Sequence, residues 1–305
     1  MPDLRIIEEN PAFGTKRVAS PKGVIAAITP TTNPTSTTIY KIMLALKTRN
    51  AIILSPHPHA VKCSIAAAKI MRDAAIQAGM PEHVISWIET PTLEISDVLM
   101  KKVDLIMATG GSGMVHAAYS SGTPAIGVGP GNCNVVIDET ADLRMAVESI
   151  IHSKTFDNGM ICATEQHITV LSSVYDEVKA LMKDARCYFL NDEEAAKVAE
   201  IFFNPKNHGV KPPAVGQTAT HLAEMAGITV PYDAKVLVYE TNDTSHDNPW
   251  ANEKLTTLLG MFRADTLEEA FNICAKLVYE GAPDTPPPCM WIPRRKTRST
   301  ALRRR

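Results

Sequence analysis

The first 130 residues alternate short apolar runs with longer stretches in which apolar residues recur every three or four positions. A short continuous apolar run is typical of a strand buried on both faces, and the second pattern is typical of an amphipathic helix. Such alternation indicates a parallel sheet covered on both faces, with ligands bound beyond the carboxyl ends of the strands. The pattern predicts strands at residues 23–28, 50–55, 84–88, 103–108 and 124–128, and helices at residues 35–46, 59–78, 92–101 and 110–119.

The second half has the same mixed character and predicts a second α/β domain. A loop separates a helix from a strand at residues 155–164, and no internal repeat or long low-complexity linker is present. We therefore expect a first domain at residues 1–132, a second at residues 133–281 and a tail at residues 282–305. The pattern predicts strands at residues 135–137, 167–171 and 236–239, and helices at residues 141–153, 174–184, 193–202, 219–226 and 267–280.

Composition narrows the class of protein. The chain has 305 residues, of which 45% are hydrophobic and 21% are charged, as in ordinary soluble proteins. No apolar run reaches the roughly 20 residues of a membrane helix, and the N-terminus lacks a signal-peptide pattern. The six cysteines contain no C-x-x-C pair, which argues against a zinc site and a disulfide framework. We expect a cytoplasmic protein with no metal site and no membrane partner.

The tail differs from the rest of the chain in its charge. Residues 282–305 contain seven basic residues and one acidic residue, although the whole chain has a net charge of −2. Such a run can be an arm that binds nucleic acid. It has no interleaved aromatic residue beyond Trp291 and no accompanying binding fold, so we expect no nucleic-acid partner.

Two polar residues are candidates for catalysis. Cys162 lies in the loop at residues 155–164. A thiolate is a strong nucleophile, and flanking backbone N–H groups can hold the oxyanion that develops when it attacks a carbonyl. A buried structural cysteine is the alternative. Asn33 follows the first strand between Pro30 and Pro34 and can donate its amide to an anion. Ordinary turn chemistry explains the same residues.

Two glycine-rich turns are candidates for binding. The turn Gly110-Gly111-Ser112-Gly113 leads from a strand into a helix, where free N–H groups suit a phosphate. It is not a full dinucleotide fingerprint, because His116 stands where the third glycine belongs. Residues 127–131 allow close backbone approach. His57 and His59 lack a third metal ligand, and Glu253 alone resembles a surface carboxylate.

Together these loops resemble the aldehyde dehydrogenase superfamily, and most closely its CoA-acylating branch. That branch includes the aldehyde dehydrogenase half of bifunctional aldehyde–alcohol dehydrogenases. The resemblance runs in order from about residue 7 to residue 281. It is carried by the segments at residues 31–37, 47–53, 55–58, 108–111, 124–132 and 154–166.

The resemblance implies an aldehyde-dehydrogenase-like α/β fold, in which a parallel-sheet NAD-binding domain precedes an incomplete catalytic domain. It implies that Cys162 attacks the aldehyde, that Asn33 and the Cys162 N–H hold the oxyanion, and that hydride passes to NAD. Coenzyme A then takes the acyl group, with acetaldehyde and acetyl-CoA as the expected substrates. The complete family enzyme is a homo-oligomer. The matching cofactor-binding positions are Thr31, Ser55, Pro56, His57, Gly110, Gly111, Gly113, Met114, Gly127 and Glu253.

One position discriminates within the superfamily. Hydrolytic members carry a glutamate general base where this chain has Gly127. Activation of water needs a base, whereas a thiol has a much lower pKa and needs less help. The glycine therefore favours CoA over water as the acyl acceptor. A hydrolytic enzyme and a non-catalytic NAD-binding remnant are the alternatives.

The C-terminus departs from the family pattern. After the helix at residues 267–280 the family continues with Gly-His-Thr and a strand, and here a proline-rich basic stretch follows. Synonymous codons exist for this stretch such that translation in a frame shifted by one base, starting at the last base of the Pro283 codon, gives that motif and strand. We therefore expect residues 282–305 to be an out-of-frame tail. The family's N-terminal helices are also missing, so we expect an impaired fragment truncated at both ends.

Overall fold

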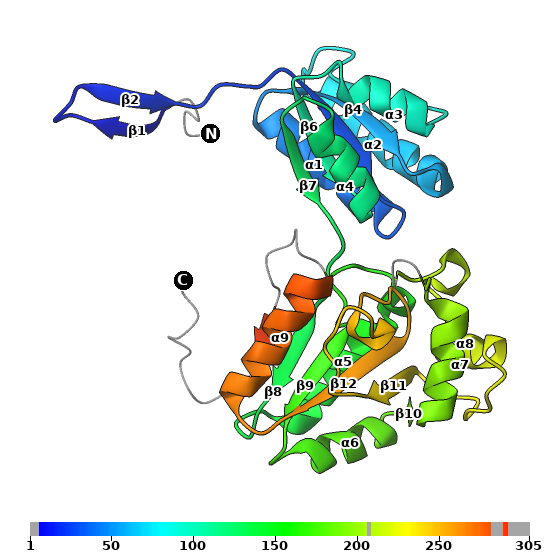
Figure 1. Cartoon of the computed structure of the whole chain (residues 1–305). Helices are drawn as coiled ribbons and strands as arrows, with labels where there is room; N and C mark the ends of the chain where they lie inside the picture. Colours follow the sequence, from blue (N-terminus) through cyan, green and yellow to red (C-terminus); the bar gives the residue numbers. More distant parts are fainter. Residues whose placement is uncertain (1–5, 206–208, 282–288, 292–305) are drawn as a thin grey trace. The chain divides into compact units, whose positions relative to one another are not determined.

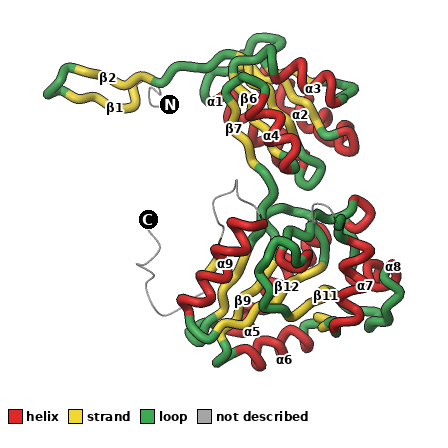
Figure 2. Tube along the Cα trace, viewed as in Figure 1, coloured by secondary structure: helices red, strands yellow, loops and turns green. Residues whose placement is uncertain are grey.

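The chain forms two compact units in a computed structural model (Figure 1). The structure describes residues 6–205, 209–281 and 289–291. The first unit comprises Met1–Gly129 and the second Pro130–Arg305. Each unit is built around its own parallel sheet, as the secondary-structure colouring of Figure 2 shows.

The first unit contains a five-stranded parallel sheet in the order β5-β4-β3-β6-β7. Apolar side chains of β3 alternate between two cores, with Ile25 and Ala27 on one face and Ala26 and Ile28 on the other. Helices α1 and α2 cover the first of these faces, and α3 and α4 cover the second. The elements are β3 (Val24–Thr29), α1 (Pro34–Lys47), β4 (Ala51–Pro56), η1 (Pro58–Ala60), α2 (Val61–Gln77), β5 (Ile85–Trp87), α3 (Leu93–Met100), β6 (Leu105–Thr109), α4 (Ser112–Ser120) and β7 (Ala125–Val128).

The strand order reverses between β3 and β6, and a buried lysine joins these two strands. Lys41 of α1 is 3% exposed, and its Nζ donates to Ile28 O at 2.7 Å and Met107 O at 2.8 Å. Burial lowers the pKa of Lys41 to about 7. Ligands of open α/β sheets bind where the strand order reverses. Lys41 therefore fixes the part of the sheet from which the candidate turns of this unit extend.

A β-hairpin precedes this sheet. Strand β1 (Ile6–Asn10) pairs antiparallel with β2 (Thr15–Val18), and every residue of both strands is exposed. The ion pairs Lys16–Glu9 and Arg17–Glu8 link the two strands. Gly14 in the turn has a φ of 60°, which glycine adopts without strain. The sequence pattern did not predict this hairpin.

The second unit contains a six-stranded parallel sheet in the order β10-β11-β12-β9-β8-β13. Helices α5 and α6 pack on one core, whereas α7 and α8 pack on another, and α9 packs beside β8 and β9. The elements are β8 (Asn134–Ile137), α5 (Leu143–Thr155), η2 (Phe156–Gly159), β9 (His167–Leu171), α6 (Tyr175–Asp184), β10 (Cys187–Phe189), α7 (Asp192–Phe202), η3 (Pro212–Ala214), α8 (Ala219–Met225), β11 (Val236–Glu240), η4 (Pro249–Ala251), β12 (Leu258–Ala264), α9 (Leu267–Gly281) and β13 (Cys289–Trp291).

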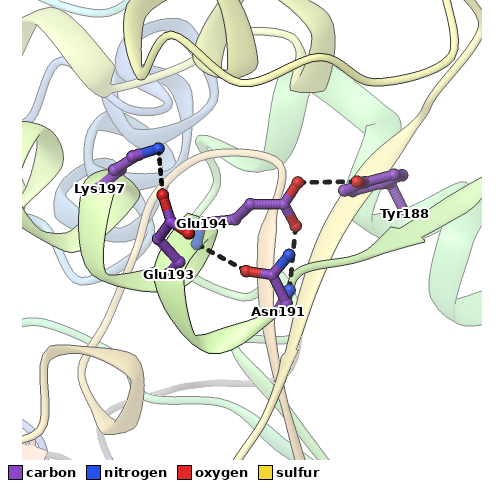
Figure 3. Close-up of polar contacts among 5 residues, drawn as sticks. All are labelled: Tyr188, Asn191, Glu193, Glu194 and Lys197. Carbon is purple, nitrogen blue, oxygen red and sulfur yellow. Dashed lines mark hydrogen bonds and ion pairs between the residues drawn. The ribbon is translucent and has the colours of Figure 1, made fainter.

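Helix α7 shows how local sequence sets one of these boundaries (Figure 3). The Asn191 side chain accepts the Glu194 N–H, and the Glu194 carboxylate accepts the Asn191 N–H. This reciprocal capping box satisfies two donors that a helix start leaves free. The other Glu194 oxygen accepts the Tyr188 hydroxyl, and Lys197 pairs with Glu193 one turn along the helix. These contacts join β10 to α7.

The structure confirms the α/β class and the parallel sheet predicted for the first unit, and it shows that the sheet of the second unit is parallel as well. All five strands and all four helices expected in the first unit are present, with ends shifted by at most two residues. The pattern missed β10, β12 and the short β13 in the second unit. Apart from the backbone of β13, the predicted out-of-frame tail at residues 282–305 lies outside the described residues. Within the described part of the chain, no helix is both long enough and apolar enough to span a membrane.

We predict that Lys41→Met destabilises the first unit, because two buried carbonyls lose their donor. The expected loss is about 2 kcal/mol in the free energy of unfolding, measured by urea denaturation. Lys47→Met is the matched control, because Lys47 lies on the same helix and is exposed. Equal stability of the two variants would contradict the role assigned to Lys41.

Candidate active site

Backbone conformation and two contacts fix the loop that carries Cys162. Asp157, Asn158 and Gly159 have φ values of 50°, 49° and 70°, so the chain turns sharply after α5. Asn158 Nδ2 donates to Gly216 O at 3.0 Å. A Cβ on Gly159 would lie 2.5 Å from Thr256 O, so only glycine fits there. The loop is therefore held against two distant segments of the second unit.

The segment that precedes β8, residues 131–133, lies directly alongside Cys162. The Cys133 thiol donates to Cys162 O at 3.3 Å, and a Cβ on Gly131 would lie 2.8 Å from the same oxygen. Cys133 O accepts the Gln166 N–H at 2.9 Å and the His167 N–H at 3.2 Å. Residues 131–133 thus hold both sides of the Cys162 loop, through the Cys133 thiol on one side and the Cys133 carbonyl on the other.

The surroundings of Cys162 shift the pKa of its thiol in both directions. Cys162 is partly buried, and burial raises the pKa of its thiol. The Glu253 carboxylate raises the pKa of this thiol further, whereas the N–H groups of Cys162 and Ala163 lower it. Those N–H groups are the donors that favour a thiolate here. Donors of this kind can also hold an oxyanion that develops next to the sulfur.

Glu253 is tied to the same segment. Its Oε1 accepts the Gly131 N–H at 3.0 Å. Burial raises the pKa of Glu253 to about 7, although the Gly131 N–H, Lys154 and Lys254 act in the opposite direction. Glu253 is therefore not the simple surface carboxylate that its local sequence suggests.

Two buried lysines next to this carboxylate were missed by the sequence analysis. Lys154 and Lys254 are both 0% exposed. Lys254 Nζ lies 3.1 Å from Gln166 O, 2.8 Å from Asn252 O and 2.8 Å from His167 Nε2. Lys154 Nζ donates to Gln166 Oε1 at 3.4 Å, and burial lowers the pKa of Lys154 to about 7. Lys154 lies on the apolar face of α5. Its helical spacing from the apolar residues of that face is the sequence signal that indicates its burial.

Asn33 belongs to the first unit, where it is the N-cap residue of α1. Its Oδ1 accepts the hydroxyl of Thr37 at 3.1 Å and that of Thr32 at 3.4 Å. This fixes the orientation of the amide, because the oxygen faces two donors. Its Nδ2 has no hydrogen bond among the described residues, so it is free to donate. Asn33 can therefore supply a neutral donor to an anionic oxygen.

The turn after β6 leaves backbone donors open at the start of α4. Gly111 is the N-cap residue of α4, and its carbonyl accepts the N–H groups of Met114 and Val115. A Cβ on Gly111 or Gly113 would meet nothing within 4 Å, so a ligand can approach the backbone closely. These features fit the phosphates of a dinucleotide. Gly110 anchors the turn to β7 by donating its N–H to Val128 O.

The residues near β4 that are predicted to bind the cofactor differ in their exposure. Ser55 is 1% exposed, and its hydroxyl bonds to that of Ser96 at 2.9 Å, so it braces β4 against α3. Pro56 ends β4 and is also buried. His57 is partly exposed, and its Nδ1 accepts the His59 N–H at 3.2 Å. Burial, with a smaller effect of His59, lowers the pKa of His57, so the ring is neutral at neutral pH. Thr31 is partly exposed in the turn after β3.

Gly127 is enclosed by α4. A Cβ on Gly127 would lie 2.7 Å from Val115 Cγ1 and 2.8 Å from Tyr119 Cε2. The Gly127 N–H donates to the Tyr119 hydroxyl at 3.0 Å. A glutamate side chain at this position would have to displace both neighbours. The packing of α4 on β7 thus leaves no room for a side chain at Gly127.

In the residues that the structure describes, no three His, Cys, Asp or Glu side chains gather in a way that could hold a metal ion. Of the predicted site residues, Cys162 and Glu253 belong to the second unit and share Gly131 as a neighbour. The others belong to the first unit, at the carboxyl ends of its strands or the helix starts that follow them.

Comparison with known proteins gives a consistent result. The model of the aldehyde dehydrogenase family matches residues 5–195. An aldehyde-alcohol dehydrogenase of Clostridium acetobutylicum is 49% identical over 276 residues, which cover 90% of this chain and 32% of that protein. The crystal structure of an acetylating aldehyde dehydrogenase from Geobacillus thermoglucosidasius is 46% identical with a TM-score of 0.85, covering 92% of this chain and 62% of that one.

A further structure carries ligands. A propionaldehyde dehydrogenase of Rhodopseudomonas palustris, solved with bound CoA and an acylated cysteine, is 30% identical with a TM-score of 0.76. The match covers 85% of this chain and 59% of that one. The chain thus spans about a third of the length of the aldehyde-alcohol dehydrogenases of Clostridium acetobutylicum and Escherichia coli.

We predict that Gly127→Ala destabilises the first unit by about 1–3 kcal/mol, because its Cβ overlaps Val115 and Tyr119. Gly113→Ala is the matched control, because its Cβ enters open space and alanine favours the helix. Thermal unfolding should show a lower midpoint for the first variant and an equal or higher midpoint for the second. If Gly127→Ala unfolded like the unmodified protein, the packing argument at this position would be wrong.

Proposed function

Because the chain belongs to the aldehyde dehydrogenase family, we propose that it carries the catalytic residues of a CoA-acylating aldehyde dehydrogenase. The reaction is aldehyde, CoA and NAD to acyl-CoA and NADH, and it is reversible. The observation that carries the proposal is the setting of Cys162. Cys162 is partly exposed at a fixed turn, and the N–H groups of Cys162 and Ala163 oppose the upward shift of its thiol pKa that burial and Glu253 cause.

Cys162 acts as the nucleophile. Its thiolate forms a carbon–sulfur bond to the aldehyde carbon, and the carbonyl electron pair moves to the oxygen. The Cys162 N–H and the free amide of Asn33 are the donors proposed for that oxyanion. Loss of hydride from the same carbon leaves a thioester on Cys162. The Thr32 and Thr37 hydroxyls support this role of Asn33, because they hold its oxygen away from the substrate.

The first unit is the proposed nucleotide-binding part. A bound nicotinamide cofactor supplies the hydride acceptor, and the resemblance to the acylating branch favours NAD for this role. The open N–H groups at the start of α4 suit its phosphates, and Lys41 holds the neighbouring strand ends. Glu253 is the carboxylate proposed to accept the hydroxyls of the nicotinamide ribose. Its ionised form accepts two hydrogen bonds, so this role requires deprotonation.

CoA is the proposed acyl acceptor. Its thiolate attacks the thioester carbon, the bond to Cys162 breaks, and the Cys162 thiolate is regenerated. The packing around Gly127 supports CoA over water, because a carboxylate that could activate water has no space there. Short aldehydes, with acetaldehyde first, are the proposed substrates. Homo-oligomeric assembly, a cytoplasmic location and the fragment character of the chain stay predictions.

We predict that acetyl-CoA acetylates Cys162 in the full chain and that added CoA reverses the modification. Intact-mass spectrometry and peptide mapping locate the acetyl group. Cys162→Ala should lose the modification completely, because no other thiol occupies the turn. Cys63→Ala is the matched control, because Cys63 is an exposed cysteine of α2 in the other unit.

The same experiment separates the alternatives. A thioester that water removes as fast as CoA does would indicate a hydrolytic enzyme. A chain that binds NAD in calorimetry but takes no acetyl group would be a non-catalytic remnant. Acetylation that persists in Cys162→Ala would disprove the proposed nucleophile.

A further inference from the structure

The peptide that joins Cys162 to Ala163 is the middle one of a tight turn. The Thr164 N–H donates to Ile161 O at 2.9 Å, so residues 161–164 form a β-turn with Cys162 and Ala163 at its two central positions. The central peptide of such a turn can face either way while that hydrogen bond is kept, and this is what distinguishes a type I from a type II turn. The orientation of this peptide therefore decides which side of the turn its carbonyl and its N–H occupy.

A segment from elsewhere in the second unit holds the carbonyl of this peptide. The Cys133 thiol donates to Cys162 O at 3.3 Å. The same oxygen lies so close to Gly131 that a Cβ there would be 2.8 Å away, so no side chain separates the two. Cys133 is buried, which shields the contact from competing water. The oxygen is thus held on the side of the turn that faces residues 131–133.

The N–H of the same peptide points the other way. The peptide is planar and trans, so its C=O and its N–H point in opposite directions. The Ala163 N–H donates to no main-chain oxygen in the part of the chain that the structure describes. It is one of the two N–H groups that lower the pKa of the Cys162 thiol, against burial and Glu253, which raise it. Fixing the carbonyl therefore keeps a free donor beside the sulfur.

The backbone of the turn restrains this peptide only in part. Ala163 does not have a positive φ, whereas a type II turn needs a positive φ at this position, which alanine adopts only with strain. That preference favours the observed orientation. Cys133 adds a contact that only this orientation can make, because a flipped peptide would turn its oxygen away from the thiol. Two independent restraints thus act on one peptide.

We propose that Cys133 is a positioning residue: its thiol fixes the central peptide of the turn at residues 161–164 and thereby holds the Ala163 N–H available to the sulfur of Cys162. This inference rests on the proposed function only in naming Cys162 as the nucleophile. No proton is transferred in this role. Burial raises the pKa of Cys133 to about 12, so its thiol stays a donor throughout the pH range of the test.

The test measures the rate at which iodoacetamide alkylates Cys162 between pH 6 and pH 10, by peptide mass spectrometry of the full chain. Cys133→Ala leaves the Cys162 carbonyl without its donor, so the Ala163 N–H faces the sulfur for a smaller part of the time. We expect alkylation of this variant to be about two- to fivefold slower at pH 7.5, the effect of one weak hydrogen bond. The difference should shrink as the pH rises, because the Cys162 thiol then ionises in both proteins.

The direction of the change separates this role from a merely structural one. A loosened loop would expose the sulfur and accelerate alkylation at every pH, whereas loss of a donor slows it near neutral pH. Glu253 is the charged group that acts on the Cys162 thiol, and Glu165, Glu253 and Lys154 act on Cys133. All of them stay in place in every variant, so they do not account for a difference between variants.

A conservative variant and a matched control make the test specific. Cys133→Ser keeps a hydroxyl that can donate to the same oxygen, and we expect it to restore most of the rate. Cys187→Ala also removes a buried thiol of the second unit, on β10, and should leave the alkylation of Cys162 unchanged. Circular dichroism and thermal melting confirm that each variant is folded.

A second substitution tests the turn itself. Glycine adopts a positive φ without strain, so Ala163→Gly weakens the other restraint on the same peptide. Combined with Cys133→Ala, it should slow alkylation by more than the product of the two single effects, because neither restraint is then left. Cys133→Val keeps an apolar side chain of similar size without a donor, and it replaces Cys133→Ala if that variant does not fold.

Three results would overturn the inference. They are unchanged or faster alkylation at pH 7.5 in the folded variant without a donor at position 133, a Cys133→Ser variant as slow as that one, and independent effects in the double variant. Acetylation by acetyl-CoA is measured separately. Its absence would reject the proposed function, whereas a wrong alkylation pattern would reject only the role of Cys133.

Discussion

The arrangement of the second unit depends on the close approach of the residue 131–133 backbone to the Cys162 loop. No side chain separates them at Gly131, where a Cβ would lie 2.8 Å from Cys162 O. That approach allows the Gly131 N–H to hold Glu253 and the Cys133 thiol to hold the Cys162 carbonyl. The Cys133 carbonyl also accepts the N–H groups of Gln166 and His167, where the chain enters β9. One steric condition therefore sets the position of the nucleophile, the carboxylate and the neighbouring strand.

Sequence patterns predicted the first unit well because its strands are buried on both faces and are punctuated by glycine and proline. The run at residues 23–28 becomes β3, and the prolines at positions 56 and 58 mark the end of β4. Strand β12 was missed although it is apolar, because it follows Thr256 and Thr257 without a turn signal. The exposed hairpin has no apolar alternation to detect. Its two strands are held together by backbone pairing and by side-chain ion pairs rather than by burial of apolar side chains.

The candidate site was predictable where a residue's chemistry is local and unpredictable where it depends on tertiary contacts. Cys162 in a glycine-containing loop and Asn33 at a helix start are local signals, and resemblance to a family assigned their roles. Lys154 looks like an ordinary polar residue near a helix end. It follows Val147, Ile150 and Ile151 on the apolar face of α5, so its spacing indicates burial. Its hydrogen-bond partner Gln166 comes from another segment, and no pattern along the chain brings the two together.

Stability alone does not explain a fully buried lysine in the last turn of the helix that leads into the Cys162 loop. A buried ion pair generally costs about as much in desolvation as it returns in attraction, and apolar replacements of similar volume are often at least as stable. Lys254 illustrates a different solution, since main-chain oxygens of Gln166 and Asn252 surround its amine. Lys154 has no comparable set of acceptors, and the Glu165 oxygen nearby is unpartnered within the described residues. A cluster left incompletely satisfied can change its protonation more readily than a saturated one. That property is a disadvantage in a structural core.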